Sequence, residues 1–264
     1  MDVVKQGQDR KLSDNHRVPA IDRMVEILGL LERHEEGLSI QEFVAASGVP
    51  RSTVYRILNS LESHAVVRRE ARGRYVLGTR LLGLAMRVRR GPGNEDLAAL
   101  AQPHLRRLSA RTHEVSKLSV LNAGAALCVE AVPGNSAYSL APLVGRHYPL
   151  HAGAASKVLF AAMEQRGRAA VLERGLQIFT PRTITNVDKL EAELARVCRN
   201  GWAEDRGEFS ISVRALAAPV RDESGAVVAA VSLAYLAELH ERQGDGFLQA
   251  VIETAEAFSG EVGG

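Results

Sequence analysis

Aromatic residues are scarce in this chain: Phe, Trp and Tyr make up 5% of its 264 residues. The hydrophobic cores must therefore be built mainly from Leu, Val, Ile and Ala. Long apolar runs are missing as well, since no stretch approaches the ~18 residues of a membrane span. The polar N-terminal segment also lacks the apolar core of a secretory signal. These absences predict a cytoplasmic protein that has no membrane partner.

Cysteine is nearly absent too. Cys128 and Cys198 are the two cysteines, and neither lies in a CxxC or Cys/His spacing that would hold a metal. His147 and His151 are four residues apart, but Pro149 between them breaks the helix that a metal-binding pair would need. No glycine-rich phosphate loop is present. We therefore predict no metal, no cofactor and no catalytic residues, and so a protein that is not an enzyme.

Charge is distributed unevenly along the chain. The net charge is +2, yet residues 51–90 carry ten Arg and only two acids, Glu62 and Glu70. The remainder of the chain is close to neutral or acidic. A local positive field of this kind is typical of a segment that faces a polyanion. A solvated basic face is the alternative that charge alone leaves open.

Residues 19–78 have the pattern of a winged helix-turn-helix. Apolar residues from Ile21 to Leu31 recur at helical spacing. Ser39 and Glu42 form the signature of a capping box that opens a second helix. Pro50 suits the first turn of a third helix. Two β-prone runs then flank Ala71-Arg72-Gly73, which predicts a hairpin. Helices joined by a short glycine-containing turn and followed by a basic hairpin define this motif.

The outer face of the third helix consists almost entirely of hydrogen-bonding side chains. Val54, Ile57, Leu58 and Leu61 occupy its core side. A recognition helix needs donors and acceptors for base edges and phosphates, and arginines on the hairpin suit the DNA backbone. We therefore predict that double-stranded DNA is contacted by Arg51, Ser52, Thr53, Tyr55, Arg56, Asn59, Arg68, Arg69, Arg72 and Arg74.

The rest of the chain suggests a second domain. Residues 1–18 are polar and predict a disordered arm. Residues 79–94 predict a linker helix and a hinge, with Gly91-Pro92-Gly93-Asn94 as the linker. Residues 95–264 alternate strands and helices, including hairpins at 115–132 and 215–234 and helices at 97–111, 152–166, 187–199 and 246–261. Hairpins favour an antiparallel sheet flanked by helices, so the fold class is α+β.

Several motifs in both halves resemble the IclR-type family of bacterial regulators. In the first half these are residues 37–40, 47–58 and 73–78. In the second half they include Pro149-Leu150-His151-Ala152, Lys157-Val158-Leu159, Gly201-Trp202-Ala203 and Ala217-Ala218-Pro219-Val220. The resemblance runs from about Ala20 to Phe258. It implies a C-terminal GAF/profilin-like sensor domain, an effector that is an organic or aromatic acid, and a homodimer that can form a tetramer as a dimer of dimers.

The resemblance also implies positions for an effector site. Carried over one by one, they are Leu140, Tyr148, Ala154, Ala155, Asp205, Val213, Ala215, Ser232 and Ala234. Simple core packing is the alternative for the apolar members, whereas the polar Ser232 and Asp205 need partners inside a sheet domain. The chain departs from the family at Ser156, at Ala234 and at Tyr235-Leu236, which weakens the case for a small carboxylate ligand.

The function that follows is a DNA-binding transcriptional regulator, more often a repressor in this family, whose binding to a palindromic operator is modulated by a small molecule. Two alternatives stay open at this stage. The second domain could serve only for oligomerisation, or it could turn over its ligand.

Overall fold

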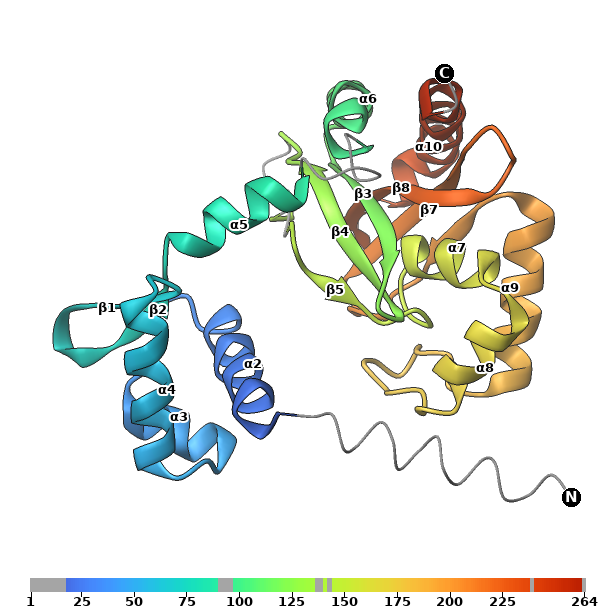
Figure 1. Ribbon diagram of the computed structural model, residues 1–264. Coiled ribbons are helices and arrows are strands. Elements are labelled where there is room, and N and C mark those ends of the chain that lie inside the picture. Colours follow the sequence, from blue (N-terminus) through green and yellow to red (C-terminus); the bar gives the residue numbers. More distant parts are fainter. Residues whose placement is uncertain (1–17, 90–96, 136–139, 142–143, 238–239, 263–264) are drawn as a thin grey trace, which may run out of the picture. The chain divides into compact units, whose positions relative to one another are not determined.

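The computed structural model describes residues 18–89, 97–135, 140–141, 144–237 and 240–262 (Figure 1). The chain forms two compact units, Met1–Gly91 and Pro92–Gly264. The predicted arm, except for Val18, and the predicted linker at 91–94 lie outside the described residues. The α+β class is confirmed, with a helical N-terminal unit and a sheet-containing C-terminal unit.

The core of the N-terminal unit is built by α2 (Pro19–Glu32), α3 (Ile40–Ser47) and α4 (Arg51–Ser63). The predicted capping box opens α3, because Ser39 N–H donates to Glu42 Oε2 at 2.7 Å and Glu42 N–H donates to Ser39 Oγ at 3.4 Å. Gly48 ends α3 in the left-handed conformation that glycine favours. The buried side chains of α2, α3 and α4 form one core around Phe43, Val54 and Leu58, which are all fully buried.

The predicted hairpin is also present. Strands β1 (Val67–Arg69) and β2 (Tyr75–Leu77) pair in antiparallel fashion, and a short 3-10 turn, η1 (Ala71–Gly73), joins them with Arg72 at φ +66°. Leu38 forms a further antiparallel bridge to Tyr75, so the segment before α3 extends this small sheet. Helix α5 (Arg80–Arg89) follows and agrees with the predicted linker helix over those residues.

A six-stranded antiparallel sheet forms the centre of the C-terminal unit, in the order β5-β4-β3-β8-β7-β6. Its strands are β3 (Val115–Asn122), β4 (Ala125–Val132), β5 (His147–Tyr148), β6 (Ala203–Asp205), β7 (Val213–Arg221) and β8 (Val227–Leu236). The two predicted hairpins are β3-β4 and β7-β8. Antiparallel pairing of β3 with β8 joins the two hairpins into one sheet, and Leu118 and Val231 are register partners in this pairing.

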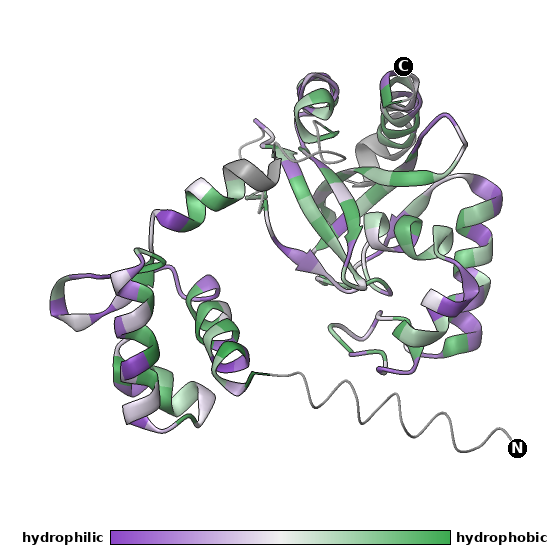
Figure 2. Ribbon diagram, in the orientation of Figure 1, coloured by the Kyte–Doolittle hydropathy of each residue, from purple (hydrophilic) through white to green (hydrophobic). Residues whose placement is uncertain are grey.

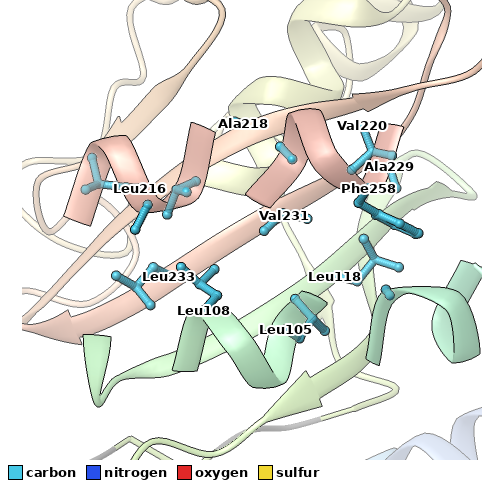
Figure 3. Close-up of a cluster of buried hydrophobic side chains, with 14 of the residues drawn as sticks. Leu105, Leu108, Leu118, Leu216, Ala218, Val220, Ala229, Val231, Leu233 and Phe258 are labelled. Carbon is cyan, nitrogen blue, oxygen red and sulfur yellow. The ribbon is translucent and has the colours of Figure 1, made fainter. Parts of the chain in front are cut away.

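Helices cover both faces of this sheet. On one face, α6 (Leu97–Thr112) and α10 (His240–Val262) pack on large side chains such as Leu118, Val231 and Leu233 (Figures 1 and 3). On the other face lie α7 (Ala154–Ala162) and α9 (Val187–Asn200), with α8 (Gln165–Leu172) beyond them. Apolar residues dominate the four long strands (Figure 2), as expected for a sheet that is covered on both sides.

One predicted helix is wrong. The pattern at 152–166 predicts a single helix, but the structure has α7 and α8 with a break at Met163, whose ψ of 147° is extended. Gly153 at φ +113° also delays the start of α7 until Ala154. The short edge strands β5 and β6 carry too few residues to show an alternating pattern, and sequence analysis did not find them.

Candidate DNA interface and effector cavity

The predicted recognition face lies on the outside of α4. Its inner positions Val54, Leu58 and Leu61 are buried, and the opposite side chains are exposed except for Thr53, which is partly buried. The exposed members are Arg51, Ser52, Tyr55, Arg56 and Asn59. No carboxylate among the described residues pairs with Arg51 or Arg56. The structure therefore leaves this basic face open to a polyanion.

The hairpin presents its arginines in different ways. Arg72 lies at the exposed turn, and Arg68 forms an ion pair with Glu70 of the same hairpin. The Arg69 guanidinium lies 5.8 Å from the centre of the Tyr75 ring. Arg72 is thus the hairpin arginine with the fewest contacts inside the protein.

Arg74 differs from the other predicted DNA contacts. Its guanidinium donates to the carbonyl oxygens of Glu36 at 3.1 Å and Gly37 at 2.6 Å, and to Glu42 Oε1 at 3.3 Å. These contacts fasten the hairpin to the segment between α2 and α3. We assign Arg74 chiefly to holding the hairpin in place, because its donors already have acceptors inside the unit.

The nine residues carried over from the family resemblance come together in the C-terminal unit. All nine line one cavity of about 310 Å³ on the α7 face of the sheet. Backbone register explains how residues so far apart in sequence meet there. Val115, Ala234, Ala215 and Asp205 are register partners across β3, β8, β7 and β6. Register partners share a face of a sheet, so they form one row across the cavity floor.

Small side chains create the space. A second row across the same four strands contains Lys117, Ser232, Ala217 and Ala203. The neighbouring residues along β7 and β8, such as Leu216, Leu233 and Tyr235, point to the opposite face because strand side chains alternate. They are buried against α6 and α10. The face toward α6 and α10 therefore carries large apolar side chains, whereas four of the eight residues in the two rows on the α7 face are alanines.

One polar group on the cavity wall is buried and has no partner in the part of the chain that the structure describes. Ser232 is 2% exposed, and its hydroxyl has no hydrogen-bond partner among the described residues. Gly153 to Ser156 also line the cavity, where the first turn of α7 has no side-chain cap. The first N–H groups of a helix lack partners within that helix and attract anions. A buried hydroxyl and a helix N-terminus thus face the same space.

Lys117 and Arg146 also line the cavity, and sequence analysis missed both. Lys117 Nζ lies 5.3 Å from the centre of the Tyr148 ring, and so does the Arg146 guanidinium carbon. Burial lowers the pKa of Lys117, and the nearby Arg146 acts in the same direction. Alternation along β3 would not have revealed this, because the polar Lys117 alternates with Leu118 and Val120 as on a strand with one solvated side.

Asp205 supports the cavity wall. Its Oδ1 accepts hydrogen bonds from Gly207 N–H at 2.8 Å and Glu208 N–H at 2.6 Å, and burial raises the pKa of its carboxyl group. The chain after β6 then crosses the sheet, since Phe209 contacts Tyr148 of the opposite edge strand with ring centres 5.3 Å apart. Asp205 therefore helps to hold the segment that roofs the cavity.

Lys157 holds the same end of this segment from the side of α7. Its fully buried ammonium donates to Glu193 Oε1 at 2.9 Å, to the carbonyl oxygen of Glu204 at 2.5 Å and to Glu208 Oε1 at 2.6 Å. Burial raises the pKa of Glu208 to about 7 against the attraction of Lys157. For Glu193 burial acts in the same direction, but hydrogen bonds from Arg196 and Lys157 lower its pKa to about 2.

Other kinds of site are not evident in the part of the chain that the structure describes. It contains no group of three or more His, Cys, Asp or Glu residues placed to hold a metal ion. Within the same residues, no helix is both long and apolar enough to span a membrane.

A helix-turn-helix unit with a basic outer face, joined in one chain to a sheet domain with a cavity, defines a DNA-binding protein of the sensor-regulator type. Two family models match the chain: the IclR helix-turn-helix domain over residues 20–71 and the bacterial transcriptional regulator IclR C-terminal domain over residues 93–260. The chain belongs to the IclR family of bacterial transcriptional regulators.

Individual relatives agree with this membership. The HTH-type transcriptional regulator Rv1719 of Mycobacterium tuberculosis is 36% identical over 213 residues, 80% of each chain. The HTH-type transcriptional repressor AllR of Escherichia coli K12 is 26% identical and covers 81% of this chain and 79% of its own length. A solved IclR homologue from Microbacterium hydrocarbonoxydans, complexed with 4-hydroxybenzoate, has a TM-score of 0.76 at 24% identity over 92% of this chain and 98% of its own.

Proposed function

We propose that this regulator is a repressor that binds a palindromic operator through the outer face of α4 and the turn of the hairpin, and that a small acid in the cavity changes its affinity for DNA. The observation that carries the DNA part is the exposed polar face of α4, which contains Arg51 and Arg56 and no acid before Glu62. The repressor AllR among its relatives supports the direction of regulation.

The cavity supports the effector part. It is lined by the unpartnered Ser232 hydroxyl, the start of α7 and two cations, with Asp205 as the acidic member of the wall. Its volume of about 310 Å³ is at the lower end of ligand pockets. The homologue complexed with 4-hydroxybenzoate makes an organic or aromatic acid the effector class to test first. We propose binding rather than turnover, in the cytoplasm where the operator lies.

A dimer is part of the proposal, since a two-fold symmetric protein reads two half-sites of a palindrome. Helix α2 supports it: Ile21 is 53% exposed and Val25 is 58% exposed, one turn apart on the same side. Leu82 and Leu84 of α5 are exposed as well. Analytical ultracentrifugation over a range of protein concentrations distinguishes this dimer from a tetramer formed by two dimers.

Fluorescence anisotropy with the protein's own upstream promoter DNA tests this function. We expect binding that weakens steeply with salt, because basic side chains displace counterions. Arg56→Ala should weaken binding by about 1–3 kcal/mol if Arg56 reads a base, and equally on random DNA if it contacts a phosphate. Arg166→Ala removes the same charge from an exposed position on α8 and should have little effect.

The outcomes separate the two parts of the proposal. Absence of salt-dependent binding to promoter DNA contradicts the DNA part. Binding that no acid shifts contradicts the effector part and favours a C-terminal unit that only oligomerises. An acid that mass spectrometry finds chemically changed by the protein would favour turnover.

A further inference from the structure

Lys117 is the one cation on the cavity floor that the described residues leave without an acceptor. Its register partner on β8 is Ser232, and register partners on one face have Cβ atoms about 4.5–5.5 Å apart. No hydrogen bond or ion pair joins Lys117 to another described residue, and its ammonium lies 5.3 Å from the centre of the Tyr148 ring. A partly buried ammonium and a buried hydroxyl therefore lie side by side, both facing the cavity.

Lys157 shows what a satisfied buried lysine looks like in the same unit. Its ammonium has three oxygen acceptors between 2.5 and 2.9 Å, two of them carboxylates. Lys117 has none of these, and Asp205, the acid on the cavity wall, already uses Oδ1 for two backbone N–H groups. A charge that is partly withdrawn from water without a partner is costly, so the cavity favours a ligand that brings an anionic group.

We propose that Lys117, with Ser232 beside it, binds the anionic group of the effector and makes the cavity select acids over neutral molecules of the same shape. This proposal rests on the proposed effector function. It assigns the preference for a charged effector to residues of β3 and β8 on the cavity floor. Arg146 lies 5.3 Å from the Tyr148 ring and 5.5 Å from the Phe209 ring. It is exposed and attracts anions toward the cavity.

Binding of an anion should be linked to a proton. Burial and Arg146 lower the pKa of Lys117, while Asp205 and Cys128 act in the opposite direction. An anion in the cavity favours the charged ammonium, so the bound state raises this pKa and takes up a proton. Affinity should then be constant below the pKa of the free protein and should fall as the pH rises through it.

Calorimetry with matched ligand pairs tests the assignment. The probes are benzoate, phenylacetate, pyruvate and succinate, each beside its neutral amide. We expect at least one acid to bind about tenfold more tightly than its amide, since a charge-assisted hydrogen bond is lost. Lys117→Met should weaken the binding of that acid about 10- to 100-fold. Lys117→Arg should retain most of the preference for the acid over its amide. Lys189→Met, at an exposed position on α9, is the control.

NMR of ¹³C-labelled lysine gives a second readout, because the chain contains only five lysines and Lys117→Arg assigns the signal. The bound acid should move the titration midpoint of Lys117 upward. Equal binding of an acid and its amide, wild-type affinity in Lys117→Met, or no binding by any of the four acids would each overturn the assignment. Lys117→Met should bind promoter DNA like the wild type, so loss of DNA binding in the wild type itself would instead mark failure of the proposed function.

Discussion

Single residues of the same type have different roles in this molecule, and their contacts separate them. Arg72 and Arg74 are two positions apart in the basic hairpin. Arg72 lies at an exposed turn, whereas Arg74 donates to two carbonyl oxygens between α2 and α3 and to the Glu42 carboxylate on α3. Lys117 and Lys157 differ in the same way within the C-terminal unit. Residue type and position in the sequence do not reveal such a difference.

We expect Arg74→Ala to lower the free energy of unfolding of the N-terminal unit by about 1–3 kcal/mol, because the carbonyl oxygen of the buried Gly37 loses its donor and two exposed hydrogen bonds are lost with it. Arg72→Ala should leave that free energy unchanged and weaken DNA binding. Chemical denaturation and anisotropy measure the two effects. Normal stability in Arg74→Ala together with a large loss of DNA affinity would mean that Arg74 contacts DNA directly.

Gly37 and Gly48 both have a positive φ, +72° and +67°, but only Gly37 is crowded. A Cβ at Gly37 would collide with the carbonyl oxygen of Tyr75, whereas a Cβ at Gly48 would meet no atom within 4 Å. Gly48→Ala should cost about 1 kcal/mol, and Gly37→Ala more than about 3 kcal/mol. Thermal unfolding measures both, and equal costs would contradict the collision.

At the scale of elements, the pattern of the chain predicted most helices and both long hairpins, because periodicity and capping are local. The capping box at Ser39 and the core face of α4 are examples. The pairing of β3 with β8 was not predictable in this way, since it joins residues more than 100 positions apart. The break at Met163 also depends on tertiary packing rather than on local preference.

The candidate site was predictable only in part. The nine cavity residues came from a family resemblance, and periodicity alone does not bring Leu140 and Asp205 together. Lys117 and Arg146 were missed because neither belongs to a motif of the family resemblance, and their place at the cavity depends on the pairing of β3, β4 and β5. The contacts of Arg74 depend on where the hairpin meets the start of α3, which no local pattern contains.

Strand β8 offers a direct comparison between its two faces. Ala234 lines the cavity, and Ala229 is fully buried in the core on the α6 and α10 side. Ala234→Leu should fill the cavity and abolish the effector response with little change in melting temperature. Ala229→Leu should overpack the core and cost about 1–3 kcal/mol. An unchanged effector response in Ala234→Leu would place the effector elsewhere.

Helix α9 carries a pH-dependent contribution through Glu193. Its pKa of about 2 lies below the ordinary value of 4.5 because Arg196 and Lys157 stabilise the carboxylate. A lowered pKa gives stability that is present above pH 4.5 and is lost as the pH falls toward 2. Glu193→Gln should therefore be less stable than the wild type at pH 6, and the gap should shrink between pH 5 and pH 2.

Urea denaturation at each pH measures this gap. Glu191→Gln on the same helix is the control, since its side chain is 41% exposed and surface pairs contribute little. A gap for Glu193→Gln that stays constant from pH 6 to pH 2 would mean that the carboxylate of Glu193 is not stabilised in the folded protein.

In the molecule as a whole, the predicted DNA-contacting residues lie in one compact unit and the cavity lies in the other. The proposed dimer adds a third level of organisation, the pairing of two chains. If α2 forms part of a dimer interface, Ile21→Glu combined with Val25→Glu should place charges in that interface. We expect sedimentation to show dissociation into monomers and promoter affinity to fall. Asp22→Asn with Glu26→Gln, at other exposed positions of α2, should stay dimeric. Unchanged sedimentation of the first variant would exclude α2 from the interface.

The join between β3 and β8 also orders events during synthesis of the chain. The core of the N-terminal unit draws on residues from Met24 to Tyr75, so every part of it has left the ribosome before the sheet begins. The central strand pair of the sheet needs residues up to Ala234, and domains generally fold as units in order of synthesis. We expect the nascent regulator to acquire its DNA-binding surface while its cavity does not yet exist.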